Sequence, residues 1–214
     1  MKNTVIRAVE ENKLIVIIRG VEKQKLIPLC EALHRGGVRL VEVTYPQGKD
    51  PAETADSISM LKKHFGDRMH IGAGTVLTEE QVTLTREAGG EFIISPNVCE
   101  AVIRKTCELG MVSMPGALTP TEIMAAHAAG ADFVKLFPIS TFGTEYIKAV
   151  RAPLSAVKLL AVGGVDLTNM EGYMKAGVSG FGIGSSITDK KMISEENFEG
   201  IEALAKEYVE KVKG

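Results

Sequence analysis

The sequence predicts a (β/α)8 TIM barrel with a short N-terminal helix. Eight short apolar runs alternate with amphipathic stretches along the 214 residues, which is the strand and helix count of that barrel. Polar side chains gather at the carboxyl ends of the runs, where the chemistry of such barrels takes place. Because no linker or shift of composition divides the chain, we expect residues 1–214 to form a single barrel domain.

The strands are assigned to apolar runs that end in Gly, Pro or a polar residue. In chain order they are predicted over residues 13–19, 38–44, 69–75, 90–95, 111–116, 132–138, 157–164 and 178–184. An open doubly wound sheet is the alternative architecture. That fold carries a glycine-rich dinucleotide turn after its first strand, and Ile18-Arg19-Gly20 is not such a turn.

The helices are assigned to the amphipathic stretches between strands. In chain order they are predicted over residues 22–36, 51–65, 143–151, 166–176 and 194–213. Between the second and third of these ranges, one helix is predicted to begin at residue 78, one to end at residue 110 and one to begin at residue 119. Thr78 to Gln81 is a capping box, and Thr119-Pro120 combines a cap with proline at the first helical position. Residues 1–12 are expected to form a small helix over the amino-terminal end of the barrel.

Strand residues in a barrel alternate between the lumen and the helix layer. In each strand, one of the two sets of alternate residues carries most of the polar side chains, and we predict that this set faces the lumen. Its members are Ile17, Arg19, Leu40, Glu42, Thr44, Ala73, Thr75, Ser113, Pro115, Phe133, Lys135, Phe137, Ala161 and Gly163.

The composition limits the partners of this chain. The net charge is −2 at pH 7, from 25 basic and 27 acidic residues, which argues against nucleic acid or an anionic membrane as partner. No apolar run reaches the ~18 residues of a membrane span, and the acidic start does not resemble a secretory signal. Three cysteines without a CxxC pair indicate a cytoplasmic protein with reduced thiols. The four histidines lack metal-binding spacing, so we expect no metal and no other cofactor.

Lys135 lies within an apolar strand, between Val134 and Leu136. Loss of solvation there favours the neutral amine, and a neutral amine can attack a ketone to form a Schiff base. The alternative is a lysine that pairs with a lumen carboxylate or holds a phosphate. The local sequence leaves both interpretations open.

Glu42 is a second ionisable residue inside an apolar strand, between Val41 and Val43. Burial raises the pKa of a carboxyl toward the range that is useful for proton transfer. The alternative is a structural ion pair with Lys135 or Arg19. The two interpretations are compatible, because a lysine that forms a carbinolamine needs a nearby proton shuttle.

Further candidates lie at the ends of four strands. Arg19 can bind a carboxylate or phosphate, or stand at the surface, and Thr75 can bind a substrate carboxylate, or act as a cap. Glycines after the seventh and eighth strands, Gly163-Gly164 and Gly182 to Ser185, suit phosphate binding through backbone N–H groups. The alternative for these glycines is an ordinary turn.

The sequence resembles the class I aldolases for 2-keto-3-deoxy-6-phosphogluconate and 4-hydroxy-2-oxoglutarate. The matching segments are GGVRLVEVT (36–44), IGAGTVLT (71–78), FIISPN (92–97), MPGALTPTE (114–122), FVKLFP (133–138) and AVGGV (161–165). The resemblance implies the role of each of nine residues. They are Lys135 as the Schiff-base lysine, Glu42 as acid/base, Thr75 for the pyruvate carboxylate, Gly163, Gly164, Gly184 and Ser185 for the phosphate, and Pro115 and Phe137 as walls. It also implies a homotrimer.

The segment after Glu42 departs from the family pattern. The family has an arginine four residues after this glutamate, where this chain has Pro46, and about four extra residues follow. Arg19, Thr75, backbone amides or Lys49 must then bind the substrate carboxylate.

We expect a Schiff-base aldolase that cleaves a 2-keto-3-deoxy sugar acid to pyruvate and an aldehyde. The first candidate substrate is 2-dehydro-3-deoxy-6-phosphogluconate, which would give glyceraldehyde 3-phosphate, and 4-hydroxy-2-oxoglutarate, which would give glyoxylate, is the second. Two alternatives stay open: a phosphate-binding barrel isomerase or synthase without an imine, and a non-catalytic barrel that binds a sugar phosphate.

Overall fold

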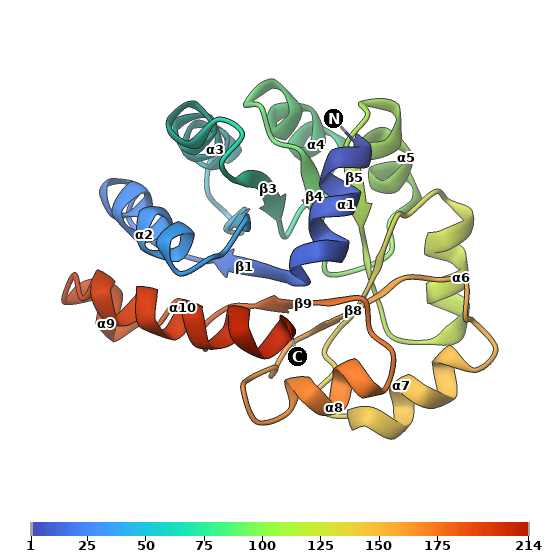
Figure 1. The fold of residues 1–214 in the computed structure, drawn as a ribbon. Coiled ribbons are helices and arrows are strands. Elements are labelled where there is room, and N and C mark those ends of the chain that lie inside the picture. Colours follow the sequence, from blue (N-terminus) through green and yellow to red (C-terminus); the bar gives the residue numbers. More distant parts are fainter. Residues whose placement is uncertain (1, 214) are drawn as a thin grey trace.

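The computed structural model describes residues 2–213 and forms a closed barrel of parallel strands surrounded by helices (Figure 1). The strands are β1 (Leu14–Ile18), β2 (Leu40–Thr44), β3 (His70–Gly74), β4 (Phe92–Ile94), β5 (Val112–Met114), β6 (Gly116–Ala117), β7 (Val134–Leu136), β8 (Leu159–Val162) and β9 (Gly180–Ile183). The sheet order is β5-β4-β3-β2-β1-β9-β8-β7-β6. The predicted TIM barrel is therefore confirmed.

The barrel closes through β5 and β6, which are two halves of one predicted strand. Pro115 separates them, and it has no N–H to donate to a ladder. β5 pairs with β4, whereas β6 pairs with β7, and the N–H of Lys135 donates to the carbonyl of Pro115 at 2.9 Å. The nine strand segments therefore occupy the eight strand positions of the barrel, because β5 and β6 share one position.

The helices occupy the predicted positions around the strands. They are α1 (Lys2–Asn12), α2 (Lys23–Arg35), α3 (Pro51–Phe65), α4 (Glu79–Glu87), α5 (Glu100–Glu108), α6 (Pro120–Ala128), α7 (Gly143–Arg151), α8 (Met170–Lys175), α9 (Lys190–Ser194) and α10 (Phe198–Lys213). The capping boxes at Thr78 and Thr119 both form. Helix α9 was not predicted, and α8 is shorter than predicted. Residues 1 and 214 of the predicted helix and domain lie outside the described residues.

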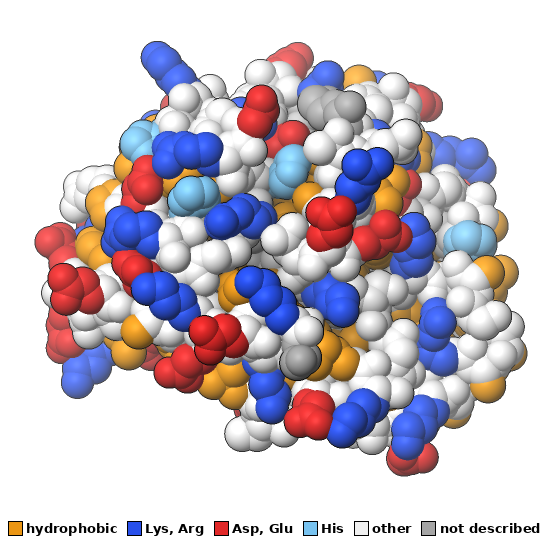
Figure 2. All heavy atoms as spheres, viewed as in Figure 1, with side chains coloured by type: hydrophobic (Ala, Val, Ile, Leu, Met, Phe, Trp, Pro, Cys, Tyr) orange, Lys and Arg blue, Asp and Glu red, His pale blue; other side chains and the backbone are white. Residues whose placement is uncertain are grey.

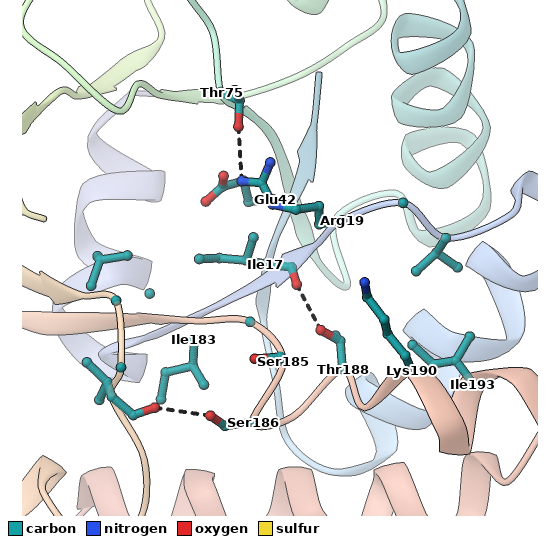
Figure 3. A pocket seen from close by; sticks show the side chains of 18 of the residues that line it. Ile17, Arg19, Glu42, Thr75, Ile183, Ser185, Ser186, Thr188, Lys190 and Ile193 are labelled. Carbon is teal, nitrogen blue, oxygen red and sulfur yellow. Dashed lines mark hydrogen bonds between the residues drawn. The ribbon is translucent and has the colours of Figure 1, made fainter. Parts of the chain in front are cut away.

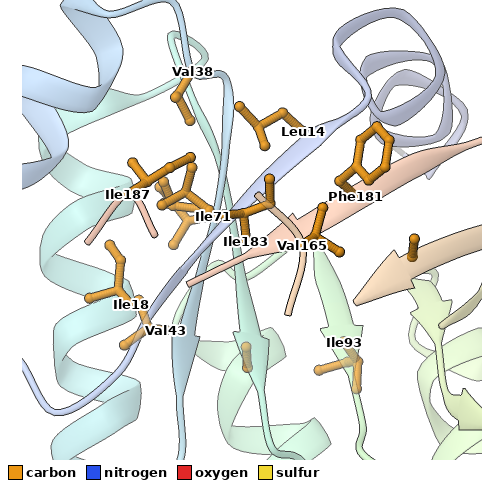
Figure 4. Packing of buried hydrophobic residues seen from close by; sticks show 14 of the residues in the cluster. Leu14, Ile18, Val38, Val43, Ile71, Ile93, Val165, Phe181, Ile183 and Ile187 are labelled. Atoms are coloured by element: carbon orange, nitrogen blue, oxygen red, sulfur yellow. The ribbon is translucent and has the colours of Figure 1, made fainter. Parts of the chain in front are cut away.

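Two apolar layers hold the barrel. The larger layer packs the outward faces of the strands against the helices, and Figure 4 shows part of it around Leu14, Ile71 and Phe181. The smaller layer fills the lumen, where Ile15, Leu40, Phe92, Val112, Phe133 and Leu160 meet Val5 and Val9 of α1. Helix α1 therefore closes the amino-terminal end of the barrel, as predicted, and it crosses the front of the strands in Figure 1.

The lumen parity was predicted correctly for β2 and β7 but wrongly for three residues on other strands. Ala73 and Ala161 pack in the outer layer. Ser113 lies between Val112 and Met114, which face the lumen. The neighbours of Ala73 are Gly72 and Gly74, where an added Cβ would collide with the lumen side chains Phe92 and Glu42 respectively. The alternation failed for three different reasons: Ala73 is flanked by glycines, β8 is apolar on both sides, and the polar Ser113 lies on the side away from the lumen residues Val112 and Met114.

Basic and acidic side chains are interspersed on the face that carries α1 (Figure 2). This distribution agrees with the net charge of −2 and offers no extended patch of one sign on that face. None of the helices within residues 2–213 has the length and apolar character needed to cross a lipid bilayer.

Candidate active site

A cavity of about 780 Å³ opens at the carboxyl ends of the strands. Arg19 follows β1, Thr75 follows β3, Phe137 follows β7, Gly163 follows β8 and Gly184 follows β9, and all five line it. Lys135, Glu42, Gly164 and Ser185 line it as well. The barrel thus brings every predicted site residue except Pro115 to one cavity.

Lys135 stands in the middle of β7 and is 7% exposed. Its Nζ lies 4.5 Å from the centroid of the Phe137 ring, and within residues 2–213 no carboxylate lies within 4.0 Å of it. Burial lowers the pKa of Lys135 from the ordinary lysine range, and the charge of Arg19 adds to this effect while that of Glu42 opposes it. The amine is therefore held toward its neutral, nucleophilic form.

Glu42 stands in the middle of β2 and is 1% exposed. Its Oε2 is buried without a hydrogen-bond partner among the described residues. Burial raises the pKa of Glu42, and the positive charges of Lys135 and Arg19 oppose the rise. The ion pair considered above does not form within 4.0 Å, so the carboxyl can hold or release a proton in a dry site.

Glycine on β3 makes room for this carboxyl. An added Cβ at Gly74 would overlap Oε1 of Glu42, so a larger residue there would require this carboxyl to move. The second glycine of the Gly-Ala-Gly run before Thr75 thus admits the side chain of Glu42.

Arg19 and Thr75 are joined by a hydrogen bond. Nη2 of Arg19 donates to Oγ1 of Thr75 at 3.1 Å, and Figure 3 shows this contact beside Glu42. Thr75 has a φ of 57°, which is costly for a β-branched residue and marks a backbone held by its surroundings. The two side chains offer a guanidinium and a hydroxyl on one side of the cavity.

The glycine loops after β8 and β9 supply the opposite wall. Gly163 and Gly164 have φ values of 91° and 73°, in the left-handed region that glycine adopts freely. An added Cβ at Gly164 would stand 2.5 Å from Cβ of Ser140. Glycine is therefore required here for turn geometry and packing, and the loop backbone lines the cavity beside Gly184 and Ser185.

Two of the residues considered above do not line this cavity. Pro115 does not line the cavity, because it interrupts the strand between β5 and β6 and its carbonyl bonds the strand backbone; Pro96, after β4, lines the cavity instead. Lys49 lines a neighbouring cavity of about 390 Å³ and not the one that holds Lys135. The longer loop after β2 turns away because Tyr45 is buried and its hydroxyl contacts Thr85 at 3.0 Å.

Several lining residues were missed. They are Gly20, Lys25, Pro96, Ser186, Thr188 and Lys190. Pro96 lies in the FIISPN segment and follows a strand, which is a usable signal. Lys190 lies in a stretch that the strand and helix pattern left unassigned. No group of three or more His, Cys, Asp or Glu side chains within residues 2–213 is arranged to hold a metal ion.

The chain is similar to curated aldolases. It is 40% identical over 158 residues to the 2-dehydro-3-deoxy-6-phosphogalactonate aldolase of Escherichia coli (strain K12), covering 73% of this chain and 77% of that protein. It is 50% identical over 118 residues to a probable 2-dehydro-3-deoxy-6-phosphogalactonate aldolase of Rhizobium meliloti (strain 1021), a match that spans 55% of this chain and 56% of that protein. It is 29% identical over 211 residues to the 2-dehydro-3-deoxy-phosphogluconate aldolase of Haemophilus influenzae, covering 98% of this chain and 97% of that protein.

Solved structures give the same result. A structure described as native KDPGal superposes with a TM-score of 0.82 at 37% identity, covering 94% of this chain and 96% of that one. The KDPG aldolase of Legionella pneumophila, with pyruvate captured as a covalent carbinolamine, superposes with a TM-score of 0.85 at 29% identity over the same shares. The model of the KDPG and KHG aldolases matches residues 5–204. With the barrel, the buried lysine and glutamate, and this match over nearly its whole length, the chain belongs to the KDPG and KHG aldolase family.

Proposed function

We propose that this chain is a Schiff-base aldolase that cleaves a 2-keto-3-deoxy-6-phospho sugar acid to pyruvate and glyceraldehyde 3-phosphate. One observation carries the proposal. Lys135 and Glu42 face one cavity, both are buried, and neither has an ion-pair partner within 4.0 Å among the described residues. An unpaired buried amine beside an unpaired buried carboxyl is suited to imine formation with proton transfer, and not to binding an anion at rest.

The reaction begins when the neutral Nζ of Lys135 attacks the C2 carbonyl of the substrate. Glu42 gives a proton to the carbinolamine hydroxyl, which leaves as water, and a protonated imine remains. Glu42 then accepts the proton of the C4 hydroxyl, the C3–C4 bond breaks, and its electron pair moves into the imine to give an enamine. The aldehyde leaves, the enamine takes a proton at C3, and water releases pyruvate from Lys135.

The rest of the cavity orients the substrate. Arg19 and Thr75 bind the substrate carboxylate, since Pro46 cannot and Lys49 lines another cavity. The backbone of Gly163, Gly164, Gly184 and Ser185 binds the phosphate, and Phe137 forms an apolar wall beside the imine. These roles fit the positions of the side chains and need no metal or cofactor.

The relatives bear on the configuration at C4. The two relatives at 40% and 50% identity are named as phosphogalactonate aldolases, while the phosphogluconate aldolases match at 26% to 32%. This favours the galactonate epimer over the gluconate epimer predicted above. Turnover of both 6-phosphorylated epimers, the unphosphorylated acids and 4-hydroxy-2-oxoglutarate identifies the preferred substrate.

The imine is tested by trapping. Borohydride reduction in the presence of pyruvate should add the pyruvate-derived group to Lys135, as read by peptide mass mapping. Lys135→Met should abolish both the adduct and turnover, and Lys158→Met serves as the control because Lys158 is an exposed lysine paired with Glu10. No adduct on the unaltered protein would favour an isomerase, a synthase or a non-catalytic sugar-phosphate protein instead.

We also propose that the chain works as a homotrimer in the cytoplasm. The family resemblance implies the trimer, and the three free cysteines fit a reducing compartment. Sedimentation equilibrium should give three times the 23.0 kDa chain mass. A monomer at micromolar concentration would contradict the assembly and leave the chemistry unaffected.

A further inference from the structure

Lys190, the first residue of α9, lines the cavity although it lies outside every predicted element. It is exposed at the mouth of the cavity. Figure 3 shows its side chain extending from the segment after β9, beside Thr188 and toward Arg19. It therefore places an ammonium at the mouth of the cavity, on the segment that also carries Ser185 and Ser186.

The other cations of the cavity are already engaged. Arg19 donates to Thr75 at 3.1 Å, and Lys135 is buried at the Phe137 ring. Lys25 donates to the carbonyls at the end of α9, those of Ile193 at 3.4 Å and Ser194 at 3.3 Å. Lys190 makes no hydrogen bond or ion pair within residues 2–213.

The acidic groups near Lys190 do not neutralise it by direct contact. The carboxylate of the preceding Asp189 caps α9 and accepts from the N–H of Met192 at 2.8 Å. Glu22, which also lines the cavity, accepts from Gln24 at 2.9 Å. The ammonium of Lys190 is thus free to meet an anion that enters from solvent.

We propose that Lys190 is a specificity-determining residue that binds the phosphate of the substrate, an inference that rests on the proposed function. The loops at Gly163-Gly164 and Gly184-Ser185 offer backbone dipoles but no full positive charge. A phosphate monoester carries a charge of about −1.5 to −2 at neutral pH, and a lysine ammonium binds it as a point charge. Because Lys190 is exposed, its contribution is screened by salt and acts mainly on substrate capture.

The test compares Lys190→Gln with Lys191→Gln. Lys191 is the neighbouring lysine on α9, but it does not line the cavity and lies 3.9 Å from Glu195. The ratio of kcat/KM for the 6-phosphorylated acid to that for the matching unphosphorylated acid should fall about tenfold in Lys190→Gln. Lys191→Gln should keep the ratio of the unaltered protein, and Lys190→Arg should retain most of it.

Ionic strength gives a second readout. The kcat/KM for the phosphorylated acid should fall with added salt in the unaltered protein and in Lys191→Gln, and less steeply in Lys190→Gln. An unchanged specificity ratio and salt slope in Lys190→Gln would overturn this inference and leave the aldolase intact. If the unaltered protein itself showed no preference for the phosphorylated acid, the proposed substrate would be wrong, and this inference with it.

Discussion

At the scale of single residues, the site depends on two ionisable groups held in a dry place against their solvation. Lys135 and Glu42 have pKa shifts in opposite directions, and desolvation is the largest cause of each. Each shift moves its group toward the neutral form, which is the form that attacks a carbonyl for the lysine and donates a proton for the glutamic acid. Their cavity is lined by Phe137, Ile17 and Val162, which keep the surroundings apolar.

Glu42→Gln keeps the shape of the side chain and removes its proton transfer. We expect kcat to fall by about 10²- to 10⁴-fold, the usual contribution of a general acid or base. Borohydride trapping of pyruvate on Lys135 after long incubation should persist, because the amine remains. Full turnover in Glu42→Gln would remove this residue from the mechanism.

Glu42 also makes stability depend on pH. Its pKa is raised in the folded state, so folding takes up a proton, and the stability this gives is present below the unfolded pKa of about 4.3. It is lost as the pH rises through the raised folded pKa. The difference in unfolding free energy, Glu42→Gln minus unaltered protein, should therefore increase with pH above about pH 4 and then level off. Urea unfolding at several pH values measures it, and a difference that declines with pH would contradict the raised pKa.

At the scale of elements, β2 and β3 together make the carboxyl site. Glu42 pairs with Gly72 in the parallel ladder, and its carboxyl lies over Gly74. Two glycines two residues apart leave an empty stripe on the lumen face of β3. The side chains of β2 and β4 fill that stripe, Glu42 at Gly74 and Phe92 at Gly72.

Gly74→Ala should displace Glu42, because the new methyl group overlaps its carboxyl oxygen. We expect an overpacking cost of about 1–3 kcal/mol in stability together with a large loss of kcat. Gly72→Ala is the matched control on the same strand, where the methyl group meets the Phe92 ring and not Glu42. Similar melting temperatures with a much lower kcat for Gly74→Ala would support the role of the glycine, and equal kcat values would refute it.

The order and type of nearly all elements could be predicted from the sequence, because apolar runs, caps and glycines act locally. Helix α3 (Pro51–Phe65) matches its predicted range, with the side chain of Asp50 as its cap. Helix α9 escaped because five residues are too few to show a helical period. The split at Pro115 also escaped, since the strand pattern continues across it.

The site was predictable where a charge interrupts an apolar strand, as at Lys135 and Glu42. It was less predictable where loops decide. Lys49 and Lys190 are both lysines in loop-rich stretches, and only the path of the chain puts the second one at the cavity. Hydrophobicity did not reveal the facing of Ala73 and Ala161, because the neighbours of Ala73 are glycines and β8, which holds Ala161, is apolar on both sides.

At the scale of the whole molecule, α1 fills the amino-terminal end of the barrel. Val5 and Val9 are fully buried among the first lumen residues of the strands. The helix belongs to the lumen core and is not an appendage. The barrel therefore has a plugged end and a functional end.

Val9→Ala should loosen this plug. Removing two buried carbons should lower the unfolding free energy by about 1–2 kcal/mol, with little effect on kcat because the site lies at the other end. Glu11→Ala, an exposed position on the same helix, is the control. Chemical denaturation of both variants measures the difference, and equal midpoints would show that α1 is only loosely attached.

The sealed amino-terminal end also determines the order in which substrates bind and products leave. With the amino-terminal end sealed, the proposed mechanism has ligands enter and leave at the carboxyl ends of the strands, with the ketone carbon deepest and the phosphate nearest the solvent. The aldehyde product therefore leaves while the three-carbon fragment is still bound covalently to Lys135. In the condensing direction the same geometry predicts an ordered reaction, in which pyruvate binds first and the aldehyde binds second.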